Sequence, residues 1–147
     1  MRFLKFYLVL FVGALAVTSV SCSKEDDAMA QVRVNGTVLF EDGDDFNGDV
    51  DGDFTGTGGN ADRTFIWNNS SATAEYNADI TAGVDGSFRM VVQDAEGMIV
   101  LDRNLSGNAD QDSFSGVTEA GVSGIWSVTI TLTNFSGDGS FSLSQGN

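Results

Sequence analysis

The stretch GIWSVTITLT, residues 124–133, decides the fold class of this chain. Its apolar side chains alternate with hydroxyl side chains at a period of two, which is typical of a β-strand with one buried and one solvated face. A second alternating stretch, Ser140–Ser144, follows Gly137-Asp138-Gly139, and a Gly-rich link between two such stretches predicts a hairpin. We therefore expect a C-terminal hairpin that buries Trp126, Val128, Ile130, Leu132, Phe141 and Leu143.

The same alternation recurs upstream, between clusters of Gly, Asn and Asp. It predicts a hairpin of Gly86–Gln93 with Met98–Asp102 around the turn at residues 94–97. Further strands are expected at Gln31–Phe40, with a bulge or kink at Asn35-Gly36, and at Thr64–Asn68, Ala72–Ile80 and Ser113–Thr118. No stretch after residue 22 has the pattern of a long helix. About eight short strands predict an all-β fold, an antiparallel two-sheet β-sandwich, because a single sheet would leave its apolar face bare.

The charge balance excludes several classes of function. The 147 residues include 7 Lys and Arg, 21 Asp and Glu, and no His. A nucleic-acid binder needs clustered cations, so no nucleic-acid partner is expected, and cationic partners or bound cations fit better. The lack of His and the single Cys exclude Ser-His-Asp and Cys-His catalysis and zinc held by His or Cys. We expect a protein that is not an enzyme and has no catalytic residues.

The N-terminal segment is typical of an export signal. Arg2 and Lys5 precede an apolar run at residues 6–17, and small residues follow up to Cys22. The alternative, a membrane-spanning anchor, needs about 20 apolar residues, and this run is shorter. Because Cys22 is the only cysteine of an exported chain, it is best explained as a site of lipid attachment. Loss of residues 1–21 leaves five cations and a formal charge of −16.

The sequence Ser19-Val20-Ser21-Cys22 resembles a bacterial lipoprotein signal. The residues that follow, Cys22-Ser23-Lys24-Glu25-Asp26-Asp27, resemble the surface-export signal of Bacteroidota lipoproteins. The resemblance implies an outer-membrane protein that is anchored by lipid at Cys22 and faces outward. The alternative is that the charged residues are only a solvated tether. We expect a signal peptide at 1–21, a lipidated cysteine and flexible acidic tether at 22–30, and a single domain at 31–147.

Seven of the 21 acids lie between Glu41 and Asp53. Counted from Asn47, side chains with oxygen ligands stand at positions one, three, five and seven of this stretch. Gly52 stands at position six, where a calcium loop turns sharply. The candidate metal ligands are Asn47, Asp49, Asp51 and Asp53. An EF-hand is not expected, because Gly58 stands where a bidentate Glu would close the shell. A simple Asp-rich calcium loop and a solvated acidic loop both stay open.

Trp67 is the candidate ligand-binding residue, because an exposed aromatic ring beside the amides of Asn68 and Asn69 suits carbohydrate. The alternative is a core position, since Trp67 shares a strand face with Phe65. Carbohydrate binding without hydrolysis is favoured over a glycosidase. A glycosidase needs two carboxyls in a cleft with one pKa raised by burial, and these acids lie in Gly-rich stretches.

The second half of the chain resembles the prepeptidase C-terminal (PPC-like) modules of bacterial proteins. The resemblance rests on VQDAEGMIV (residues 92–100), GIWSVTI (124–130) and GDGSFSL (137–143). It implies a jelly-roll-like sandwich with a binding or spacer role. We expect a non-enzymatic, lipid-anchored adhesion or glycan-binding module of the cell surface that is stabilised by calcium. The alternative is a structural or assembly subunit of an envelope layer, fibre or complex that binds protein partners through sheet edges.

Overall fold

The computed structural model describes residues 27–147, so the predicted signal peptide, Cys22 and the first part of the tether lie outside the described residues. Among the described residues the all-β prediction is confirmed, and no helix there is long and apolar enough to cross a membrane. The strands are β1 (Ala30–Val34), β2 (Thr37–Val38), β3 (Asp44–Asn47), β4 (Val50–Asn69), β5 (Ala74–Ile80), β6 (Asp85–Gln93), β7 (Ile99–Ser106), β8 (Ser113–Val117) and β9 (Gly124–Gln145).

All nine strands belong to one hydrogen-bonded sheet in which β4 and β9 pair along nearly their whole lengths. On one half of this long pair the order is β2-β1-β4-β9-β5-β8, and on the other half β3 flanks β4 while β6 and β7 continue from β9. The pairs are antiparallel except β3 with β4, which is parallel. The two separately bonded sheets expected from the sequence are therefore not observed. Only short strands were predicted, whereas β4 has 20 residues and β9 has 22.

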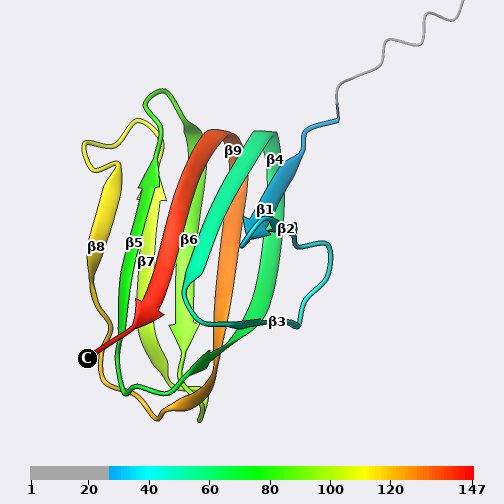
Figure 1. Ribbon diagram of the computed structural model, residues 1–147. Helices are drawn as coiled ribbons and strands as arrows, with labels where there is room; N and C mark the ends of the chain where they lie inside the picture. The colour runs from blue at the N-terminus through cyan, green and yellow to red at the C-terminus, as the bar shows by residue number, and fades with distance from the viewer. Residues whose placement is uncertain (1–26) are drawn as a thin grey trace, which may run out of the picture.

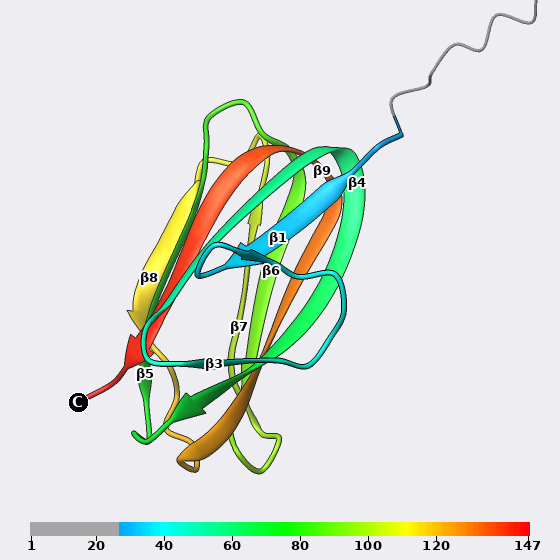
Figure 2. The same ribbon diagram turned by 45° about the vertical axis from the view of Figure 1, so that its right-hand side comes forward.

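The long pair bends where glycines and asparagines interrupt it. The register shifts between Thr57 and Ala61, and positive φ angles occur at Gly58 (96°), Asn134 (46°) and Gly137 (132°). We call this bend, residues 57–61 and 134–137, the arch. Figures 1 and 2 show both strands curving over one end of the molecule, the end at which β1 begins. The sheet consequently folds back on itself, and its two halves pack face to face.

Aromatic rings fill the space between the two halves. Phe54 of β4 stacks on Phe88 of β6 with ring centroids 4.4 Å apart and planes inclined by 7°. Along β4 and β9, Gly52 lies opposite Phe141 and Gly139 opposite Phe54. A methyl group on either glycine would overlap the ring across from it. Glycine is thus required at both positions, because only a residue without a side chain lets the ring lie flat against the neighbouring strand.

The predicted C-terminal hairpin is wrong. Ile125–Thr133 and Ser140–Ser144 both belong to the single strand β9, and neither pairs with the other. The Gly-Asp-Gly at 137–139 bends the strand at the arch instead of reversing it, because β4 follows the same curve and keeps the backbone groups paired. The predicted burial of this stretch is correct, and so is the hairpin of β6 with β7.

The predicted kink at Asn35-Gly36 is also wrong, because these residues form the tight turn between β1 and β2. Their φ angles are 49° and 81°, and two positive φ angles are typical of a type I′ hairpin turn. Phe40, the last residue of the strand predicted at Gln31–Phe40, is 76% exposed, because β2 ends at Val38. The predicted strands at 72–80 and 113–118 are confirmed within two residues at each end.

Candidate functional site

A cleft of about 510 Å³ lies along β8, at the side of the molecule where β8 and β7 end the two halves of the sheet. Three strands and one loop build it. Its lining residues are Asn77, Ala78 and Asp79 of β5, Arg103 of β7, Gln111 of the preceding loop, and Ser113, Phe114 and Ser115 of β8. Amide, carboxylate, guanidinium and hydroxyl groups therefore surround one aromatic ring, a set that can hydrogen-bond a polar ligand.

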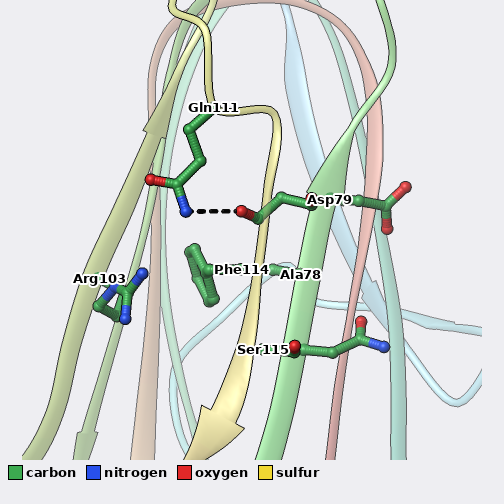
Figure 3. Close-up of a pocket in the computed structure, with 8 residues that line it drawn as sticks. Ala78, Asp79, Arg103, Gln111, Phe114 and Ser115 are labelled. Carbon is green, nitrogen blue, oxygen red and sulfur yellow. Dashed lines mark hydrogen bonds between the residues drawn. The ribbon is translucent and has the colours of Figure 1, made fainter.

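Arg103 and Gln111 stand over β8 from the side that faces β7 (Figure 3). The Arg103 guanidinium lies 5.1 Å from the centroid of the Phe114 ring, within cation–π range. The Gln111 side-chain amide donates to the Ser113 carbonyl at 2.8 Å. Of the other arginines among residues 27–147, Arg33 and Arg89 pair with carboxylates and Arg63 donates to backbone carbonyls. Arg103 thus brings a positive charge to the cleft of an acidic protein.

The backbone of β8 is bonded on one side, by β5. At the two ends of this ladder, Ile80 donates to the Asp112 carbonyl and Thr118 to the Ala74 carbonyl. Bonded pairs alternate along an antiparallel ladder, so the even-numbered residues of β8 face β5. The N–H and C=O groups of Ser113, Ser115 and Val117 point to the opposite side, along the cleft. This row is the free edge of β8, and it can bond an added strand.

The four candidate metal ligands lie on a strand end, a turn and a second strand. Asn47 ends β3, Asp49 follows the turn at Gly48, and Asp51 and Asp53 lie in β4. Asp53 stands 3.9 Å from the Arg33 guanidinium, and the Asp49 carbonyl accepts from the Asn35 amide. Among residues 27–147 no group of three or more His, Cys, Asp or Glu side chains could hold a metal ion. Calcium at these residues stays a prediction.

Trp67 is not available to stack on a ligand. Its side chain is 0% exposed, its indole N–H donates to the Gly48 carbonyl at 2.6 Å, and its ring packs edge-on against Trp126. The prediction of Trp67 as a ligand-binding residue is therefore wrong, and its alternative, a core position beside Phe65, is correct. Burial of both tryptophans follows from their places on the inner faces of β4 and β9.

Asp94 is a buried carboxylate in the predicted turn at residues 94–97. Its oxygens accept from the backbone N–H groups of Val122 at 2.8 Å, Met98 at 2.8 Å and Glu96 at 3.0 Å. These donors, Val122 foremost, hold the pKa of Asp94 below its ordinary value. Because Val122 lies between β8 and β9, Asp94 fastens the β6–β7 turn to that connection. An Asp three residues before Gly97 is a sequence signal for the turn alone.

Arg89 and Asp102 form the closest ion pair among the described residues. Two guanidinium nitrogens of Arg89 donate to the two carboxylate oxygens of Asp102 at 2.8 and 2.7 Å. The Arg89 hydrogen bond and charge hold the pKa of Asp102 below its ordinary value. Both side chains are about half exposed, so the pair joins β6 to β7 on the outer face without adding much stability.

No protein-family model, curated protein or solved structure matches this chain.

Proposed function

We propose that this chain is a non-enzymatic, lipid-anchored binding or adhesion module of the outer-membrane surface. The anchor is Cys22, and the binding surface is the cleft along β8. The observation that carries the proposal is the cleft itself, whose side chains offer donors and acceptors around the Phe114 ring. A glycan has hydroxyl groups for such side chains and an apolar sugar face for an aromatic ring. We also propose that the folded-back sheet is a β-sandwich of the jelly-roll or PPC-like kind.

A glycan array probed with residues 22–147 tests the proposal. Asn77→Ala and Arg103→Ala each remove one cleft side chain, and we expect each to weaken a glycan signal several-fold. Asn68→Ala is the matched control, because Asn68 is an exposed asparagine outside the cleft. If no glycan is retained, or if Asn68→Ala weakens the signal as much as Asn77→Ala does, the glycan part of the proposal falls.

Calcium is a separate part of the proposal with its own test. A site that binds only the folded protein stabilises it by about 2.7 kcal/mol when calcium exceeds the dissociation constant a hundredfold. Thermal melts in EDTA and in calcium, with the parent and an Asp49→Asn/Asp51→Asn variant, give the comparison. A midpoint that rises with calcium in the parent alone supports the site. Equal midpoints in both solutions remove it.

The second candidate function is a structural or assembly subunit of the cell envelope that binds protein. A specific observation favours it: β8 is bonded by β5 on one side only, so this strand presents free backbone groups. Proteins that bind through sheet edges use such strands. Sedimentation over a range of concentrations separates the candidates, because a protein that is monomeric throughout and binds glycan argues against self-assembly.

A further inference from the structure

Four strands end the branches of the sheet: β2, β3, β7 and β8. Natural edge strands are usually kept from pairing by charged side chains, by Pro or by extreme shortness. Here β2 has two residues, β3 contains two aspartates, and β7 contains Asp102 and Arg103. By contrast, β8 has five residues, Ser-Phe-Ser-Gly-Val, with no charge and no Pro. Among these four edges, β8 is thus the one whose own residues set no charge and no Pro against a second strand, and its nearest acids along the chain, Asp112 and Glu119, lie just outside its ends.

We propose that β8 pairs antiparallel with β8 of a second copy of this chain, about a two-fold axis at Ser115. In this register Ser115 lies opposite Ser115, and Ser113 opposite Val117. These three residues are the ones that direct their backbone groups to the free edge, so both copies can bond all of them. The Gln111 amide leaves the Ser113 carbonyl, and the Val117 N–H of the second copy replaces it.

The same register is complementary on both faces. On the inner face Phe114 lies opposite Gly116 of the second copy, which repeats the Phe–Gly pairs that β4 and β9 form at Gly52–Phe141 and Phe54–Gly139. On the outer face hydroxyl and valine side chains meet at the axis. The acids of β5 are one strand further back, so those of the two copies are about 14 Å apart. That distance exceeds the screening length in physiological salt, about 8 Å.

The pairing also sets where the two tethers leave. Met29 donates its N–H to Thr57 at the arch, so the tether joins the domain at the arch end. Strand β8 runs away from that end, because its first residue lies opposite Asp79 and its last opposite Glu75. Antiparallel pairing therefore places the two arches, and the two tethers, at opposite ends of the pair. If the proposed lipid anchor is present, this arrangement suits copies on two facing membranes.

Disulfide trapping tests the register in residues 22–147 carrying Cys22→Ser. With Ser115→Cys the two thiols meet at the axis, where bonded residues have Cα atoms about 5.5 Å apart, within reach of a disulfide. With Ser113→Cys, the matched control, the same residues of the two copies are about 13 Å apart. We expect a disulfide-linked dimer for Ser115→Cys and little or none for Ser113→Cys. Equal dimer yields, or none for either, would overturn the proposal.

Charge reversal tests the pairing without a covalent bond. Ser115→Asp and Ser115→Lys each place like charges on the axis, and we expect sedimentation equilibrium to show about a tenfold weaker association for each alone. An equimolar mixture of the two variants should associate at least as well as the parent. Ser115 is exposed, so both variants should keep the parent's melting midpoint. A parent that is monomeric at high concentration, or a mixture that stays dissociated, contradicts the proposal whatever the cleft or the anchor does.

Discussion

Two parts of the sheet combine phenylalanine with glycine: the long pair of β4 with β9, and the edge strand β8. The results differ. Between β4 and β9, Phe54 and Phe141 each lie over a glycine of the neighbouring strand, and both strands are bonded on two sides over much of their length. In β8, Phe114 packs into the core under Arg103, while the strand is bonded on one side only. The long pair is therefore complete in its hydrogen bonding, whereas the free edge of β8 can still bond a partner strand.

The largest effect on stability is expected in the long pair of β4 with β9. Phe54 is fully buried and packs against Phe88, Phe135 and Phe141. Phe54→Ala removes these contacts and leaves a cavity between the two halves of the sheet, so we expect a loss of about 3–5 kcal/mol in the free energy of unfolding. Urea denaturation measures it. Phe40→Ala, which truncates a mostly exposed ring, is the control and should change the stability by no more than about 0.5 kcal/mol.

The next effect tests the glycines of the same pair. A side chain on Gly52 overlaps the ring of Phe141, which is itself buried. We expect Gly52→Ala to cost about 1–3 kcal/mol through overpacking. Phe141→Leu makes room for the added methyl group, so the double variant should lose less than the sum of the two single losses. If the two losses simply add in urea titrations, the flat packing of ring on glycine is not what fixes this position.

Those glycines also explain why β4 could not be predicted from the sequence. Residues 50–69 include four glycines and three aspartates before residue 63, a composition typical of loops. The strand forms because β9 pairs with it along this stretch and the Phe141 ring covers Gly52, a condition set by a segment about ninety residues further along the chain. Likewise, Gly137-Asp138-Gly139 is a local turn signal, and pairing with β4 decides that the chain bends there without reversing.

The alternation of apolar and polar residues was sufficient to predict the buried face of a strand that has one buried and one exposed face throughout. The buried face of the first half of β9 was predicted residue by residue, and Trp126, Val128, Ile130 and Leu132 are all buried. The cleft had no comparable signal. Its residues come from β5, β7, β8 and the loop at Gln111, and only the pairing of β5 with β8 brings Asn77 and Asp79 beside Ser113 and Ser115. A site assembled from four segments leaves no spacing to detect in the sequence.

The next effect depends on pH and concerns the connection that follows β8, which the buried carboxylate of Asp94 holds in place. The folded protein holds the pKa of Asp94 below the unfolded value, about 3.9. The stabilisation is therefore present above that unfolded value and is lost as the pH falls through the folded pKa. We expect Asp94→Asn to have a lower thermal midpoint than the parent at neutral pH, and the two midpoints to converge on acidification.

Glu96→Gln is the control for this titration. It removes one charge from the same turn while the backbone N–H groups that bind Asp94 remain. Its midpoint should follow that of the parent down to acidic pH. If Asp94→Asn and Glu96→Gln titrate alike, the net charge of the protein causes the pH dependence, and Asp94 does not hold the connection after β8 in place.

The smallest effect belongs to the edge itself. Arg103 lies over the Phe114 ring and is partly exposed, so Arg103→Ala should cost only about 0.5–1 kcal/mol in urea titrations. Arg103→Lys keeps a cation and an aliphatic stem over the ring and should recover most of that loss. In the Phe114→Leu background the loss caused by Arg103→Ala should shrink toward zero, because leucine has no aromatic face, so the double-mutant cycle should give a coupling close to the full loss. A loss from Arg103→Ala as large as that from Phe54→Ala would mean that β8 is held as firmly as β4 and β9. The contrast between a complete pair and an accepting edge would then no longer hold.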